Sequence, residues 1–110
     1  MAYDEELARR VRNLLDSRAD VNERMMFGGI CFLVGGKIAC GVRSDELIVR
    51  AEPEHAYELI ESEPGARPFD HNGRPIRGWL WVAREATAED ADLERWVRRG
   101  EAFAASQSPR

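Results

Sequence analysis

The sequence is poor in the residues that build metal and catalytic sites, with only two histidines and two cysteines among its 110 residues. A zinc site needs four ligands that lie close together, and here the histidines fall in a later helix and loop, away from the cysteines. No serine occurs in the strand-turn-helix context that presents a nucleophile. We therefore expect no catalytic residue, no metal and no cofactor, and interpret the chain as a non-enzymatic protein.

The chain also lacks a long hydrophobic run and an excess of positive charge. No apolar stretch approaches the roughly 20 residues that cross a bilayer, and the charged N-terminus does not resemble a signal peptide. Lysine and arginine number 16 against 20 aspartates and glutamates, which gives a formal net charge of −4. Without a basic face or a recognition helix, the domain alone is not expected to bind duplex DNA tightly. We expect a cytoplasmic protein with no membrane segment, whose thiols are reduced.

The first half of the chain contains one helical pattern and then a strand pattern, as in a small globular domain over residues 1–110. Apolar residues recur at helical spacing over residues 4–17, and Asp4 can cap the start of that helix. Three short apolar runs then follow, separated by Gly35-Gly36 and by a weaker turn. They predict a three-stranded meander over residues 29–51.

The second half begins with a short helix, which starts at Pro53 and ends at Pro64-Gly65. Residues 65–78 are then expected to be a loop with an Asn72-Gly73 turn. Within it, Phe69–His71 can pair with the strand that follows.

The chain closes with a strand over residues 79–83 and a helix from Thr87 to Ser106, for which Thr87 is the expected N-terminal cap. The predicted order is α-βββ-α-ββ-α. Tight turns make neighbouring strands antiparallel. The sequence therefore predicts an α+β domain whose single antiparallel sheet of about five strands has helices on one face.

The glycine pairs Gly28-Gly29 and Gly35-Gly36 raise the question of a phosphate-binding loop. Such a loop needs a helix directly after the glycines, with its N-terminus toward the anion. Both pairs are followed by strand-like residues, and no Lys-Ser/Thr pair closes the motif. We interpret these glycines as turn and bulge residues.

Cys31 and Cys40 are equidistant from the Gly35-Gly36 turn, so a regular hairpin places them directly opposite each other. The same register puts both cysteines on one face with Leu33 and Ile38, and we take this as the core face. Buried reduced thiols are the expected state. A cross-strand disulfide or a redox role is the alternative.

Two neighbouring segments supply candidate binding residues. Arg67, Arg74 and Arg77 could hold a phosphate group or a partner's carboxylates, or could pair with this protein's own carboxylates. Trp79 and Trp81 share one face of their strand, which could be core or a partner surface.

The sheet face opposite the helices is expected to be an interaction surface, because three helices cover only one face of a small sheet. In the register above, that face carries Phe32. Homodimerisation is the simplest form of such an interaction. The candidate binding residues are Arg67, Arg74, Arg77, Trp79, Trp81 and Phe32.

A series of short motifs also runs through the chain in order. They are Met26-Phe27-Gly28-Gly29 before the apolar hairpin, DELIVRA, ARPF, Gly73-Arg74-Pro75, WLWV and LERWVRRGEAFA. Together they resemble the N-terminal domain of TfoX/Sxy-type proteins over about residues 4–106.

The resemblance implies an α+β fold with a single antiparallel sheet, like that of type III secretion chaperones, and no catalytic residues. It also implies transcriptional regulation of competence for DNA uptake, in which full-length members act as coactivators beside the cyclic-AMP receptor protein. Those members carry a second, helical domain, and this chain resembles the first domain alone. We expect a regulatory domain that binds a protein partner such as a transcription factor. The alternative is a small-ligand or phosphate-binding domain that uses the arginine-rich segment and the aromatic strand.

Overall fold

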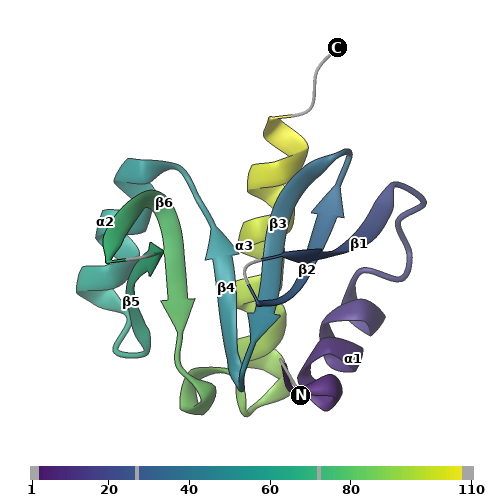
Figure 1. The fold of residues 1–110 in the computed structure, drawn as a ribbon, viewed down its shortest axis with the longest axis horizontal. Helices are drawn as coiled ribbons and strands as arrows, with labels where there is room; N and C mark the ends of the chain where they lie inside the picture. Colours follow the sequence, from purple (N-terminus) through teal and green to yellow (C-terminus); the bar gives the residue numbers. More distant parts are fainter. Residues whose placement is uncertain (1–2, 27, 72, 108–110) are drawn as a thin grey trace.

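The computed structural model describes residues 3–26, 28–71 and 73–107, which form three α-helices, one short 3₁₀ helix and one six-stranded sheet (Figure 1). The predicted α+β class and the single antiparallel sheet are confirmed. The additional strand is β1, which precedes the meander. In chain order the elements are α1 (Glu5–Leu14), β1 (Val21–Met26), β2 (Gly29–Val34), β3 (Lys37–Arg43), β4 (Glu46–Arg50), α2 (Pro53–Ser62), β5 (Ala66–His71), β6 (Arg74–Val82), the 3₁₀ helix (Arg84–Thr87) and α3 (Asp90–Ser106).

The strands lie in the order β1-β2-β3-β4-β6-β5. The first four strands follow one another in the chain as antiparallel neighbours. α2 then carries the chain past β4, so that β6 returns to pair with β4 and leaves β5 at the edge. The centre of the sheet therefore joins the two halves of the chain.

All three helices cover the same face of the sheet, as predicted. α3 runs behind β3 and β4, with α1 and α2 on its two sides (Figure 1). The core between the layers contains buried side chains from the central strands and from α3, including Leu47, Val49, Leu80, Val82 and Trp96. We call the opposite face of the sheet the open face.

The caps of the first and last helices differ from each other. The side-chain Oδ1 of Asp4 accepts hydrogen bonds from the backbone N–H groups of Glu6 and Leu7, at 2.9 and 3.2 Å, which confirms the predicted cap. The predicted cap at Thr87 is wrong, because Thr87 belongs to the 3₁₀ helix and its hydroxyl donates to the carbonyl of Arg84. α3 starts three residues later, without a side-chain cap.

The β2–β3 hairpin turns at Gly35-Gly36, where φ is +60° and +87°, as expected of turn glycines. Its register shifts between Phe32 and Leu33, however, so Cys31 lies opposite Gly41 and Cys40 lies opposite Phe32. The shift inserts one extra residue into β3. The predicted pairing of Cys31 with Cys40 is therefore wrong, and the two thiols point to opposite faces.

The two faces of β2 are also the reverse of those that the sequence predicted. Phe32 is fully buried in the helix-covered core, so its expected place on the open face is wrong. Leu33 lies on the open face, opposite to its predicted side. Alternation groups the side chains of β2 correctly but does not say which group the helices cover. The extra residue in β3 then moves Cys40 and Val42 to the covered face, with Phe32.

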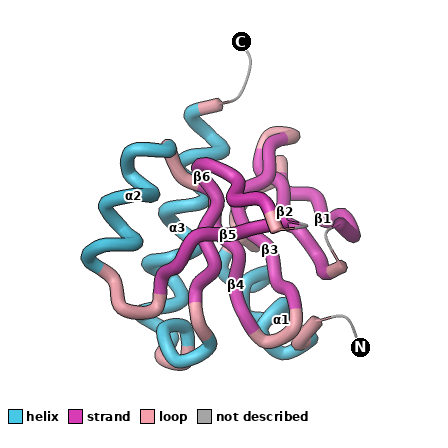
Figure 2. The backbone as a smooth tube through the Cα atoms, turned by 60° about the vertical axis from the view of Figure 1, so that its left-hand side comes forward, coloured by secondary structure: helices cyan, strands magenta, loops and turns pink. Residues whose placement is uncertain are grey.

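The segment expected to be a loop is mostly the β5–β6 hairpin. Asp70 pairs with Pro75, and the register shifts between Pro68 and Asp70. Gly78, at φ +82°, lies in the β6 part of this irregularity. The predicted turn residue Asn72 lies outside the described residues. The outer part of the hairpin extends away from the helical layer (Figure 2).

Candidate interaction surface

Trp79 and Trp81 lie on the open face of β6, while Leu80 and Val82 between and beyond them are buried in the core. Both indoles are half-buried. They pack against the buried ring of Phe69 from β5, with ring centroids 5.6 Å from Trp79 and 5.0 Å from Trp81. The alternation predicted from the sequence thus places both tryptophans in one aromatic cluster.

Three arginines from three strands surround this cluster. The guanidinium carbon of Arg50 on β4 lies 4.6 Å from the Trp79 ring centroid. Arg43 on β3 and Arg67 on β5 lie 5.8 and 5.5 Å from the Trp81 ring centroid. These distances allow cation–π attraction. We call the five residues Trp79, Trp81, Arg43, Arg50 and Arg67 the tryptophan–arginine surface.

Arg67 also forms an ion pair inside the protein. Its Nη2 lies 2.6 Å from Oε1 of Glu46, the residue that starts β4. Of the alternatives left open by the sequence, pairing with the protein's own carboxylates is therefore the one seen for Arg67. The pair fixes the guanidinium beside Trp81, since one side chain holds both contacts.

Charge on the open face is mostly of one sign. Arg24 on β1 lies directly opposite Cys31, so it projects from the same face as the tryptophan–arginine surface. With Arg43, Arg50 and Arg67, the open face has four arginines. Among the described strand residues whose face is fixed by register or contact, the negative side chain on that face is Glu46. The whole chain has a net charge of −4, so this face is positive while the chain as a whole is acidic.

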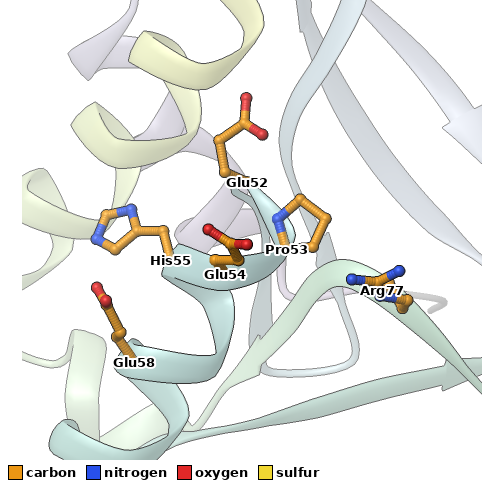
Figure 3. Close-up of a pocket in the computed structure, with 6 residues that line it drawn as sticks. All are labelled: Glu52, Pro53, Glu54, His55, Glu58 and Arg77. Atoms are coloured by element: carbon orange, nitrogen blue, oxygen red, sulfur yellow. The ribbon is translucent and has the colours of Figure 1, made fainter.

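The three arginines of the arginine-rich segment do not converge. Arg74 is exposed at the start of β6, opposite His71. Arg77 lies toward the first turn of α2, where it lines an open hollow of about 520 Å³ with four polar residues and a proline (Figure 3). On the α2 side, the hollow is lined by three acidic residues, Glu52, Glu54 and Glu58, together with His55 and Pro53. Arg67 and Arg77 therefore belong to different faces of the molecule.

Sequence reasoning missed Arg43, Arg50 and Phe69. The β3–β4 and β4–β6 pairings bring Arg43 and Arg50 to the tryptophans, and the β5–β6 pairing brings Phe69. The sequence did contain a signal for Arg50, which ends an apolar run. Arg50 is two residues after Ile48, so both side chains point to the open face of β4.

Both cysteines are buried, as predicted, and both carry free thiols. Burial raises the pKa of Cys31 to about 11. Burial also raises the pKa of Cys40, with smaller contributions from Cys31 and Glu101. A raised pKa keeps a thiol protonated and unreactive at neutral pH.

Among the residues that the structure describes, no three histidine, cysteine, aspartate or glutamate side chains are grouped so that they could hold a metal ion. Within the same residues, no helix has the length and apolar character required to cross a bilayer.

The comparisons with known proteins agree with this fold. The sequence model of the TfoX N-terminal domain matches residues 13–104. The structure is similar to the crystal structure of Deinococcus radiodurans protein DR2400, which carries the domain DUF419. The TM-score is 0.69 at 19% sequence identity, over 91% of this chain and 79% of that one. No curated protein matches the sequence. Because the family match spans most of the 110 residues, this chain belongs to the TfoX N-terminal domain family.

Proposed function

We propose that this chain is a non-enzymatic protein-interaction domain whose tryptophan–arginine surface binds an acidic face of a partner protein. We further propose that the partner is a transcription factor, and that the complex acts in the cytoplasm in the regulation of competence for DNA uptake. The observation that carries the proposal is the pair of half-buried tryptophans, surrounded by arginines, on a sheet face that none of the described helices covers. Tryptophan and arginine are the residues most enriched at the energetic centres of interfaces.

The charge of the open face supports a different protein as partner over a second copy of this chain. A twofold-symmetric dimer brings the same patch of both subunits together. Two copies of this face would set four arginines against four arginines, with one glutamate on each side, and like charges across an interface are unfavourable. An acidic partner instead meets complementary charge. Homodimerisation through this face is therefore the less favoured form of the interaction.

Enzymatic activity has little support in the geometry. The described histidine side chain, His55, is exposed on α2 beside glutamates rather than beside a nucleophile. A general base must lie within hydrogen-bonding distance of the group that it activates. The two thiols are buried and held in the protonated form, so neither is presented as a nucleophile.

The test compares capture of a partner from the source cell by three forms of the immobilised domain. Arg43→Glu reverses one charge of the tryptophan–arginine surface, and Arg9→Glu makes the same change on α1. We expect wild type and Arg9→Glu to retain the same partner, and Arg43→Glu to lose it. Binding of the purified partner should weaken as salt is raised. Equal capture by all three forms would contradict the proposed surface.

A second candidate is a small-ligand or phosphate-binding domain. The observation in its favour is the stacking of Arg50 on Trp79. Of the arginines first considered for a phosphate, Arg67 already holds Glu46 and Arg77 lies toward α2. Differential scanning of thermal unfolding with and without inorganic phosphate tests it, because a ligand that binds only the folded state raises the unfolding temperature. An unfolding temperature that responds equally to phosphate and to chloride would remove this candidate.

A further inference from the structure

Arg50 lies between two aromatic rings from two different layers of the fold. Its guanidinium carbon is 4.6 Å from the ring centroid of Trp79 on β6 and 4.8 Å from that of Phe103 on α3. Arg50 is the last residue of β4, so it sits at the end of the sheet where the chain leaves for α2. Both the open face and the last turns of α3 therefore contribute to its surroundings.

The charge of Arg50 has no counter-charge among the described residues. Its side chain makes no hydrogen bond or ion pair to any of them, and its Nε is buried without a hydrogen-bond partner. The carboxylate next along the chain, on Glu52, accepts a hydrogen bond from the side chain of Gln107 instead. Three other arginines that stack on rings each hold a carboxylate: Arg12 with Glu23, Arg67 with Glu46, and Arg99 with Glu63.

A half-buried cation without a partner is an unfavourable arrangement. Burial lowers the pKa of Arg50, yet an arginine stays charged at neutral pH. The contacts with the two rings restrict the position of the guanidinium, which lowers the cost of ordering it when an anion arrives. The arrangement is thus prepared for a negative group that the chain itself does not provide.

We propose that Arg50 is an oxyanion receptor, which binds one phosphate or carboxylate group end-on through its two Nη groups between Trp79 and Phe103. The buried Nε cannot take part without movement, so the ligand engages the outer fork of the guanidinium. Such forks bind carboxylate and phosphate oxygens with two parallel hydrogen bonds. The proposal rests on the second candidate function, the phosphate-binding domain, and deepens it by naming the binding residue and by including α3.

The test follows the Nε–H signal of Arg50 and the indole N–H signal of Trp79 by ¹⁵N NMR. The ¹⁵N-labelled protein is titrated with inorganic phosphate, with acetate, and with chloride at matched ionic strength. We expect the Arg50 and Trp79 signals to shift and reach saturation, while the signal of Arg67, which holds Glu46, shifts less. Saturation by phosphate alone assigns a phosphate site, and saturation by both anions assigns a general oxyanion site. Shifts that match those in chloride, or that never saturate, would overturn the proposal.

Variants separate binding at Arg50 from binding elsewhere. Arg50→Lys keeps the charge and loses the planar fork, so we expect weaker binding, and Arg50→Gln should abolish saturation at Trp79. The control is Arg84→Gln, which changes an arginine whose side chain is 74% exposed and should leave the titration unchanged. A titration of Trp79 that survives in a folded Arg50→Gln protein would place the anion elsewhere. If that variant does not fold, the wild-type titration decides by itself.

Discussion

Gly100 of α3 lies so close to Ala39 of β3 that a Cβ atom on Gly100 would stand 2.2 Å from the Ala39 carbonyl oxygen. Ala39 is the extra residue of the irregularity in the β2–β3 hairpin. The bulge and the glycine therefore form one contact, at which α3 rests directly on the backbone of the sheet. No side chain fits there unless the helix moves away.

Gly100→Ala should destabilise the protein by about 1–3 kcal/mol, the usual cost of overpacking a core. Helix propensity acts the other way, since alanine is favoured over glycine inside a helix by about 0.5–1 kcal/mol. The measurement is urea unfolding of both proteins. Ala102→Gly, at an exposed position of α3, isolates the propensity effect. An increase in stability for Gly100→Ala would mean that α3 does not rest on β3.

Phe32→Ala should destabilise the protein by about 3–5 kcal/mol, because Phe32 is fully buried in the core between the sheet and the helical layer. Met25→Ala, at a side chain that is 62% exposed on β1, should change stability by less than about 0.5 kcal/mol. Chemical unfolding of the two variants makes the comparison. A nearly neutral Phe32→Ala would restore the open-face position that the sequence suggested.

Stability should fall as the pH rises above about 9. The pKa of Cys31 is raised from 9.0 to about 11, so the folded state holds its proton where the unfolded chain releases it. The contribution of this thiol is complete below the unfolded value and is lost as the pH rises toward the folded value. Cys31→Ala should flatten the loss of stability between pH 9 and 11, measured by urea unfolding. An identical slope in both proteins would contradict the burial of this thiol.

The domain alone should form no complex with duplex DNA tighter than roughly 10⁻⁶ M at physiological salt. The open face has few arginines. Arg43 and Arg67 stack on Trp81, and Arg67 also pairs with Glu46. Fluorescence anisotropy with a labelled duplex measures this. A nanomolar complex that weakens steeply with salt would show that the open face binds DNA directly.

The sequence predicted most of the fold because its helices and central strands carry clear periodicity and turn glycines. It did not reveal β1, since Asn22, Glu23 and Arg24 are exposed on an edge and give no apolar alternation. It did not reveal the bulge either. Nothing near Ala39 marks an extra residue, and the contact that accommodates it comes from Gly100, more than sixty residues later.

The sequence offered Trp79, Trp81 and Arg67 as candidate residues, but not the residues that β3 and β4 contribute to the same surface. Alternation placed Trp79 and Trp81 together, and the structure agrees. Arg43 and Arg50 reach those rings from other strands, so their contribution depends on strand order rather than on local pattern. Proximity in sequence suggested a cluster of Arg67, Arg74 and Arg77, yet the β5–β6 register shift directs Arg77 toward α2.

The exposed edge strand β1 affects how copies of this protein can aggregate. Two identical antiparallel edges related by a twofold axis must place one residue opposite itself. The registers that pair most of β1 are centred on Glu23 or Arg24, so each sets like charges face to face at the axis. At the other edge, Pro68 removes a backbone donor from β5. Both edges of the sheet are thus protected against growth into an extended fibre of the chain's own kind.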